Sequence, residues 1–165
     1  MQQRVLGLCL LSASLFLIGI RSASAQEPVT FGLSYDVFYR EFEETSVAGV
    51  HIDVAKPFGM LAGVGEIGFN HFGGATVSSF MGGGRLVFPH GTSSKIEPAV
   101  QVLLGAWRCC EERDFAIQPG FIVDFPYSRN LKIRGQIDLR HIFFSDFQDE
   151  NAIRLSAGIV LNLGK

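Results

Sequence analysis

The sequence predicts an all-β protein, an eight-stranded antiparallel up-and-down β-barrel, from three observations. Residues 131–140 read LKIRGQIDLR, in which apolar and polar side chains alternate strictly. A helix places residues three and four apart on one face, whereas a strand sends successive side chains to opposite faces. Seven further segments repeat this alternation and are separated by turn-forming or charged residues. The chain after residue 25 has the length of one domain.

Residues 1–25 are a predicted signal peptide. Arg4 provides a positive start, residues 5–20 are mainly apolar, and 23–25 (ASA) form a small-residue cleavage site. The apolar run is interrupted by serines and is shorter than the roughly 20 residues that a membrane-spanning helix requires. We therefore expect export, removal of the peptide and a mature barrel domain over 26–165.

Each predicted strand has one apolar and one polar face. The strands span roughly 29–40, 47–56, 60–70, 78–88, 95–107, 115–124, 131–140 and 152–163. In the first of them, Phe38 is an aromatic exception on the polar face. The third and fourth are rich in glycine, so that their register is less strongly specified. Their expected polar-face members are Glu66 and Arg85.

The connections between these strands are of two kinds. Those after the second, fourth and sixth strands contain turn residues, and those after the first, fifth and seventh are acidic. The turn-like connections are 56–59, 89–94 and 126–130, the acidic ones are 41–44, 111–114 and 146–150, and the connection at 70–76 is glycine-rich and uncharged. An up-and-down barrel places alternate connections at opposite ends. We therefore predict a turn end and an acidic loop end, with the loop end outside the cell and both termini in the periplasm.

The charge balance excludes a basic nucleic-acid-binding surface. The sequence has 14 Lys and Arg residues against 16 Asp and Glu residues, and loss of the signal peptide removes Arg4 and Arg21. The mature chain is therefore acidic, and nucleic acid is not an expected partner. Charged residues make up 18% of the chain, below the roughly 25% of ordinary soluble domains.

Alternation alone does not decide which face points inward. With the apolar face inward the protein is a soluble barrel, and with the apolar face outward it lies in lipid. The polar face carries small residues among charges of both signs, which suits the narrow interior of eight strands. These small residues are Gly32, Ser34, Gly49, Ala99, Gly120, Ser156 and Gly158. We therefore favour the outward arrangement, a transmembrane barrel with a polar, side-chain-filled interior.

Aromatic residues near both ends support this arrangement. Phe31, Phe58, Phe88, Phe125 and Tyr127 lie near the predicted turn end, and Tyr39, Phe42, Phe72, Trp107, Phe115 and Phe143 lie near the loop end. Mainly aliphatic residues lie between the two groups. Two aromatic belts around an aliphatic band are typical of outer-membrane barrels, because aromatic rings favour the two membrane interfaces.

The tail of the chain carries a family resemblance. Residues 158–163 (GIVLNL) resemble the carboxy-terminal assembly signal of outer-membrane barrels, with Leu where aromatic residues are usual and with Gly164 and Lys165 following. Together with the strand pattern, this makes the chain similar to the small eight-stranded outer-membrane β-barrel family of the OmpA transmembrane-domain and OmpX type.

The resemblance implies an integral outer-membrane protein with a structural or surface-interaction role, and not a wide porin. Its expected partners are outer-membrane lipid, the barrel assembly machinery during insertion, and an extracellular partner at the loops that the sequence does not identify. The expected oligomeric state is a monomer. The alternative is a soluble periplasmic barrel of the lipocalin type that binds an apolar ligand.

The candidate site is a polar network in the lumen. Its predicted members are Glu66, Arg85, Glu97, Gln101, Gln118, Lys132, Arg134, Gln136, Asp138, Arg140 and Arg154. Asp36, Asp53 and Asp124 lie on the same face. Acids and bases are nearly balanced and buried charges need partners, so we expect structural pairing across the lumen. Paired charges also plug the barrel in the family that the chain resembles, and eight strands leave no wide aqueous channel.

No cofactor, metal or catalytic site is expected. The adjacent Cys109 and Cys110 leave two free thiols, a vicinal disulfide and a chance pair as alternatives, and no residues have the spacing of a metal site. A remote alternative is a barrel enzyme that modifies lipid A, since such enzymes use His with Ser and an acid. Its candidates near the loop end are His71, His141, Ser145 and Asp146.

Overall fold

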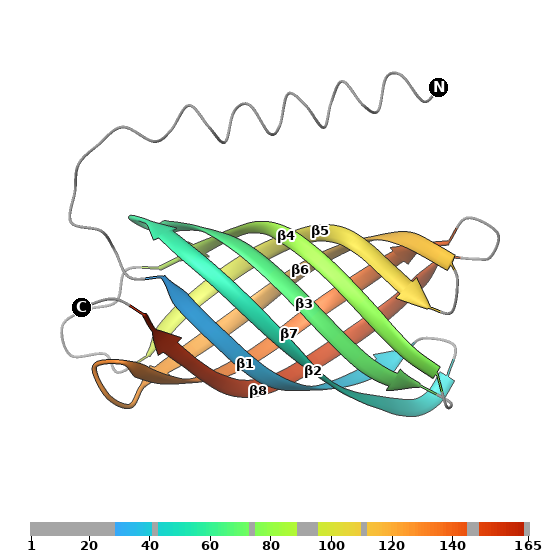
Figure 1. The fold of residues 1–165 in the computed structure, drawn as a ribbon, viewed down its shortest axis with the longest axis horizontal. Coiled ribbons are helices and arrows are strands. Elements are labelled where there is room, and N and C mark those ends of the chain that lie inside the picture. The colour runs from blue at the N-terminus through green and yellow to red at the C-terminus, as the bar shows by residue number, and fades with distance from the viewer. Residues whose placement is uncertain are drawn as a thin grey trace, which may run out of the picture.

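The computed structural model shows eight antiparallel strands that close into a barrel (Figure 1). It describes residues 29–40, 43–72, 75–88, 96–109, 112–144 and 149–163. The strands are β1 (Thr30–Arg40), β2 (Glu43–Phe58), β3 (Leu61–Phe72), β4 (Ala75–Val87), β5 (Glu97–Cys109), β6 (Glu112–Pro126), β7 (Leu131–Phe143) and β8 (Glu150–Asn162). The predicted fold class is confirmed.

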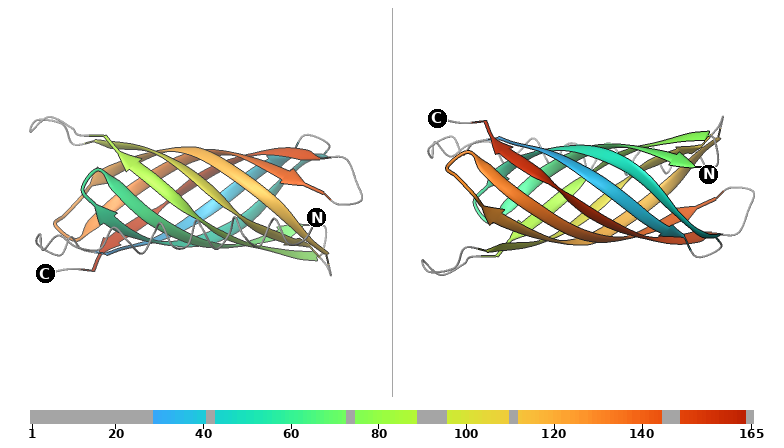
Figure 2. Two further views of the ribbon diagram at one scale, coloured as in Figure 1. Left: turned by 90° about the horizontal axis from the view of Figure 1, so that it is seen from above. Right: turned by 90° about the horizontal axis from the view of Figure 1, so that it is seen from below.

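Each strand pairs with its neighbours in the sequence, and β8 pairs with β1 to close the wall. The views in Figure 2 show the same tilted, continuous wall from above and below. Closure gives each of the eight described strands two partners, so that the sheet they form has no free edge. The ends of the described chain meet at the turn end, where the Leu163 amide donates to the Val29 carbonyl at 2.8 Å.

All eight predicted strands are present, but several are longer than the pattern indicates. β2 continues to Phe58, and β6 begins at Glu112 and ends at Pro126. The predicted connection at 70–76 is too long, because β3 and β4 remain paired as far as Phe72 and Ala75. Backbone hydrogen bonding continues wherever a neighbouring strand offers partners, whether or not the side chains alternate.

The predicted signal peptide lies outside the described residues and stays a prediction. Within the described part of the chain, no helix is long and apolar enough to cross a membrane.

The polar face of each strand points into the lumen. On β7 the side chains of Arg134, Asp138 and Arg140 are buried, whereas Ile133 and Ile137 are 49% and 46% exposed. The alternation that identifies this strand therefore separates the inside of the barrel from the outside. The predicted assignment, polar inside and apolar outside, is confirmed.

Exposed apolar side chains cover the outer wall on every strand. Representatives from β1 to β8 are Leu33, Val50, Ile67, Phe80, Val102, Phe121, Ile137 and Leu155. Phe58, Phe88, Phe125 and Tyr127 are exposed near the turn end, and Tyr39, Phe115 and Phe143 near the loop end. Water-soluble monomers rarely expose continuous apolar surface larger than a few hundred Å².

Trp107 corrects one part of the aromatic assignment. The sequence pattern places it in the outer belt of the loop end, but its side chain is 6% exposed and lies inside the lumen. Its ring packs edge-on against Phe38, with 6.3 Å between centroids. The height of Trp107 along the barrel suggests the outer aromatic belt, but its position along β5 decides which face of the strand it occupies. Trp107 is an even number of residues from the buried Gln101 and therefore lies on the same, lumenal face.

Trp107 is the only tryptophan of the chain, which makes this correction testable. Its fluorescence is expected to resist quenching both by iodide in water and by lipids brominated on their acyl chains, because the barrel wall separates the indole from both. Strong quenching by the brominated lipids would show that Trp107 lies on the outer surface. A matched control is Phe115→Trp in a Trp107→Phe background, since Phe115 is 51% exposed on the outer wall, and this variant should be quenched.

Candidate functional site

The lumen brings together all eleven predicted network residues. Nine of them are buried, and Glu97 and Lys132 are partly buried near the turn end. They occupy alternate positions on six strands, β3 to β8, whose inward faces converge on a narrow interior.

The turn end of the network is held by two basic residues of β7. Lys132 pairs with Glu97 of β5. Arg134 donates to both oxygens of Asp124, at 2.7 and 2.9 Å, and to both oxygens of Asp53, at 3.0 and 3.1 Å. A guanidinium has a planar array of donors, so that it can bridge two carboxylates that an ammonium would hold only singly.

Arg85 and Gln101 connect this end to the centre. Arg85 donates to Asp53 at 3.1 Å and to Gln101 Oε1 at 3.0 and 3.2 Å. The amide nitrogen of Gln101 in turn donates to Asp138 at 3.4 Å. The chain of contacts therefore continues from one charged group to the next across the lumen.

Arg154 is the centre of the network and is fully buried. Its Nε donates to Asp138 at 2.8 Å, and its two terminal nitrogens donate to the carboxylate of Glu66 at 2.7 and 2.9 Å. A third carboxylate, that of Asp36, lies 3.7 Å from Arg154 and 2.7 Å from His51 Nδ1. One guanidinium thus neutralises charge from three different strands.

Arg140 joins the network to an apolar layer at the loop end. Its Nε donates to Gln118 at 2.6 Å, and one terminal nitrogen lies 3.7 Å from Glu66. The guanidinium carbon is 4.9 and 5.0 Å from the ring centroids of Phe38 and Trp107. These rings supply cation–π attraction to a buried cation.

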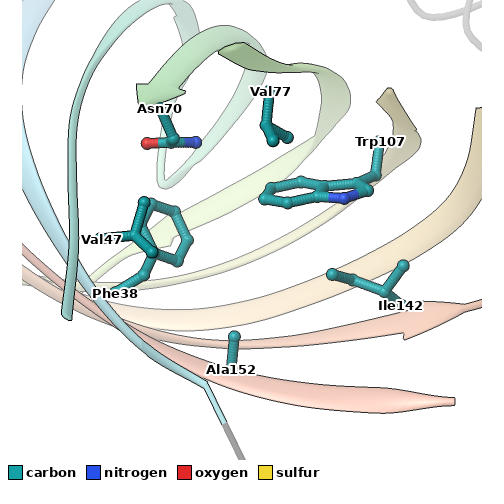
Figure 3. A pocket seen from close by; sticks show the side chains of 7 residues that line it. All are labelled: Phe38, Val47, Asn70, Val77, Trp107, Ile142 and Ala152. Carbon is teal, nitrogen blue, oxygen red and sulfur yellow. The ribbon is translucent and has the colours of Figure 1, made fainter. Parts of the chain in front are cut away.

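The apolar layer, in which Asn70 is the one polar side chain, surrounds a small hollow at the loop end of the lumen (Figure 3). Its seven side chains come from seven strands and surround a hollow of about 10 Å³, roughly the room of one water molecule. The lining residues are Phe38, Val47, Asn70, Val77, Trp107, Ile142 and Ala152. The sequence does not predict this layer, because its pattern indicates an interior that is polar throughout.

The structure adds members to the network. Asp36, Asp53 and Asp124 lie on the predicted polar face, and His51 follows from the same alternation. Asn70 and Ser79 are also buried in the lumen, outside the network's hydrogen bonds, and the sequence pattern misses both. Asn70 stands where the predicted strand 60–70 meets the predicted connection 70–76, and the glycine-rich strand of Ser79 has weak alternation. Counting every second residue from Glu66 and from Arg85 identifies both positions.

The network has the features of a structural core. The buried arginines Arg85, Arg134, Arg140 and Arg154 each lie within 4 Å of at least one carboxylate. Among the described residues, no group of three or more His, Cys, Asp or Glu side chains is arranged to hold a metal ion. Removing one partner of such a pair would leave a buried charge unpaired, so we expect the network to have a structural role.

The catalytic alternative gains no support from the described residues. His141 Nδ1 lies 2.8 Å from Asn151 Oδ1, and its Nε2 lies 3.8 Å from Asp149. Neither partner is a hydroxyl or thiol nucleophile. Ser145 and Asp146 lie outside the described residues, as does Cys110, and Cys109 is partly buried at the end of β5.

Glycines on the lumenal face make room for the network. A Cβ on Gly120 would lie 1.8 Å from Asp138 Oδ1 and would displace the carboxylate that Arg154 and Gln136 hold. We expect Gly120→Ala to lower the free energy of unfolding by about 1–3 kcal/mol, the usual cost of overpacking. The measurement is urea unfolding of the protein refolded in detergent.

Gly135→Ala is the matched control, because a Cβ at Gly135 on the outer face meets nothing within 4 Å. We expect it to change stability by less than about 0.5 kcal/mol, as is usual for surface changes. Equal losses of unfolding free energy in Gly120→Ala and Gly135→Ala would contradict the packing described for Asp138.

No family model matches the sequence, and no curated protein matches it. Solved structures share the fold. Neisserial surface protein A matches with a TM-score of 0.64 at 12% identity, covering 86% of this chain and 99% of that one. Ail, the attachment invasion locus protein of Yersinia pestis, matches with a TM-score of 0.55 at 10% identity, covering 82% and 96%. The amino-terminal barrel domain of Pseudomonas aeruginosa OprF matches with a TM-score of 0.54 at 10% identity, covering 82% and 100%.

These likenesses, together with the outward apolar face, define the class of fold. The chain has the architecture of the small eight-stranded outer-membrane β-barrels, of the kind that the sequence pattern indicates. The low identities extend this likeness to the fold alone.

Proposed function

We propose that the protein is an integral outer-membrane barrel, exported with a cleaved signal peptide and inserted by the barrel assembly machinery as a monomer. Its role in the membrane is structural or one of surface interaction. The observation that carries this proposal is the reversed polarity of the barrel. Charged side chains fill its interior, and apolar side chains such as Val50, Phe80 and Leu155, each more than 40% exposed, cover its exterior.

The energetics of the two surroundings favour lipid. In water, each Å² of exposed apolar surface on this outer wall would cost about 25 cal/mol of free energy. In a bilayer the same surface contacts acyl chains. The closed wall also satisfies the backbone, since lipid offers no hydrogen bonds to a free strand edge. A soluble barrel with an apolar ligand inside does not fit, because Arg134, Asp138 and Arg154 occupy the ligand's place.

The same interior argues against a wide porin and against catalysis. Ion pairs bridge the lumen over most of its length, and the layer around Phe38 and Trp107 closes the loop end. We therefore propose a protein that is not an enzyme and does not pass solutes of porin size.

The loop end is where a surface partner would bind. Ail is named as an attachment invasion locus protein, which supports interaction as one form of the role. The connections after β1, β5 and β7 are acidic, and the one after β3 is glycine-rich and uncharged. Those after β1, β3 and β5 leave only two residues between strands. An extracellular partner would therefore meet a small, negatively charged rim, in the orientation that places the turn end in the periplasm.

Fractionation of the expressed full chain tests the location. We expect the protein in the outer-membrane fraction, resistant to carbonate extraction and released by detergent, with a mature amino terminus at Gln26. Recovery in the periplasmic soluble fraction without detergent would contradict it. Reconstitution in planar bilayers tests the closed lumen, where porin-scale conductance would count against it.

A further inference from the structure

His51 of β2 lies in the lumen between two carboxylates, and its side chain is fully buried. Its Nδ1 is 2.7 Å from Asp36 Oδ1 on β1, and its Nε2 is 3.9 Å from Glu66 Oε2 on β3. An ionised carboxylate only accepts hydrogen bonds, so Nδ1 carries a hydrogen and donates to Asp36. The second ring nitrogen, Nε2, has no hydrogen-bond partner. Whether Nε2 also carries a hydrogen therefore decides whether the ring is neutral or positively charged.

The lumenal ion pairs described above form two sets, and one of them is balanced. At the turn end, three carboxylates face three basic side chains: Asp53, Glu97 and Asp124 with Arg85, Lys132 and Arg134. In the central set, three carboxylates share two guanidinium groups: Asp36, Glu66 and Asp138 with Arg140 and Arg154. When the His51 ring is neutral, the central set therefore has one more negative charge than positive charges.

The contacts around His51 favour a charged ring. Arg154 Nη1 lies 3.3 Å from His51 Nδ1 and would repel it, but this nitrogen is closer to Glu66 Oε1, at 2.7 Å. The guanidinium of Arg154 is itself neutralised by the carboxylates that it holds. The side chain of Ser79 on β4, beside Gly68, is neutral. The charged groups that surround His51 are Asp36 on β1, Asp53 on β2, Glu66 on β3, Asp138 and Arg140 on β7, and Arg154 on β8.

We propose that His51 is a proton-binding site that couples the stability of the barrel to pH. The protonated ring donates from Nδ1 to Asp36, places the hydrogen of Nε2 beside Glu66, and supplies the positive charge that the central set lacks. Loss of this proton leaves a buried negative charge without compensation, which is costly away from water. The central ion pairs are therefore stronger at mildly acidic pH and weaken as the pH rises.

The direction of the pH effect follows from counting protons. Free histidine loses its ring proton near about pH 6.5. Above this pH the unfolded chain releases the proton, whereas the folded barrel keeps it on His51. Stability then falls as the pH rises, by up to about tenfold in the folding equilibrium constant for each pH unit. Aspartate and glutamate in the unfolded chain are already ionised in this range, so they do not produce the same effect.

Nitrogen-15 NMR of the barrel refolded in detergent, with labelled histidine, reads the state of the ring directly. The chain has four histidines, and the signals lost in His51→Gln assign those of His51. We expect a hydrogen on both ring nitrogens of His51 at about pH 7.5, where free imidazole is mostly neutral. A single ring hydrogen on His51 at this pH would overturn the inference.

Urea unfolding at a series of pH values from about 6.5 to 8.5 tests the coupling to stability. We expect the wild type to lose stability as the pH rises. Asp36→Asn removes the excess negative charge, and it should lose most of this pH dependence, as should His51→Gln. His141→Gln is the matched control, because His141 is partly exposed and pairs with Asp149 outside the network, and it should keep the dependence of the wild type.

Two results of the unfolding series would overturn the inference. One is a wild-type stability that does not change over this pH range. The other is a stability that increases with sodium chloride at every pH but does not depend on pH, because the missing positive charge would then come from a bound cation and not from His51.

Discussion

Arg154→Ala is expected to lower the free energy of unfolding by about 3–5 kcal/mol, the usual cost of removing one partner of a buried ion pair. Arg154 is the shared partner of Glu66, Asp138 and Asp36. Without it, Asp36 keeps its contact with His51 and Glu66 keeps a 3.7 Å approach to Arg140. Asp138 keeps the neutral amide donors of Gln101 and Gln136.

Equilibrium unfolding in urea, with the protein in detergent or lipid vesicles, measures this loss through the fluorescence of Trp107. Arg129→Ala is the matched control, because the Arg129 side chain is exposed in the connection between β6 and β7. We expect Arg129→Ala to lower the free energy of unfolding by less than about 1 kcal/mol, as for other surface charges. A similar small effect at Arg154 would show that the network does not stabilise the barrel as described.

Ile137→Arg is expected to cost about 2–4 kcal/mol, because it places a charge near the middle of the apolar outer band. Ile137 is 46% exposed near the centre of β7, between Phe121 and Leu155 of the neighbouring strands. The measurement is the unfolding free energy in lipid vesicles. Leu163→Arg is the depth control, since Leu163 is 63% exposed at the turn end, where an arginine should cost about 0–1 kcal/mol.

Equal losses of unfolding free energy for Ile137→Arg and Leu163→Arg would contradict a membrane around the barrel. Arg134→Lys provides the inward comparison: it keeps the positive charge but cannot reproduce the four hydrogen bonds to Asp124 and Asp53. We expect it to be less damaging than Ile137→Arg, because the lumenal position retains a cation among carboxylates.

Strand alternation predicts most of the fold, because the period of two is a property of the backbone and needs no knowledge of partners. The sequence alone places Arg134, Asp138 and Arg154 on polar strand faces, and the lumen is where all three lie. Alternation also indicates closure, since eight strands of similar length with connections of two kinds fit an up-and-down barrel. It does not predict the pairing inside, since Arg154 meets Glu66 across 88 residues of sequence.

The errors have physical causes as well. Height along the barrel assigns Trp107 to the outer belt, although its position along β5 places it inside. The sequence does not predict the apolar layer around Phe38, because a single aromatic residue on a polar face looks like an isolated exception. The structure shows that Trp107, Val77 and Ile142 lie around the same hollow. Glycine-rich β3 and β4 carry few side chains with which to mark register, which is why Asn70 and Ser79 are missed.

Cysteine labelling at two opposite faces of β7 tests the central claim most directly. Ile137→Cys and Arg134→Cys are each made in a background with Cys109→Ser and Cys110→Ser, and native outer membranes are treated with a lipid-soluble maleimide. Ile137 is exposed on the outer wall and Arg134 is 2% exposed in the lumen. We expect labelling of the thiol at position 137 and protection of the thiol at 134. Labelling at 134 by a water-soluble maleimide in a detergent-free soluble fraction, with 137 protected, would contradict it.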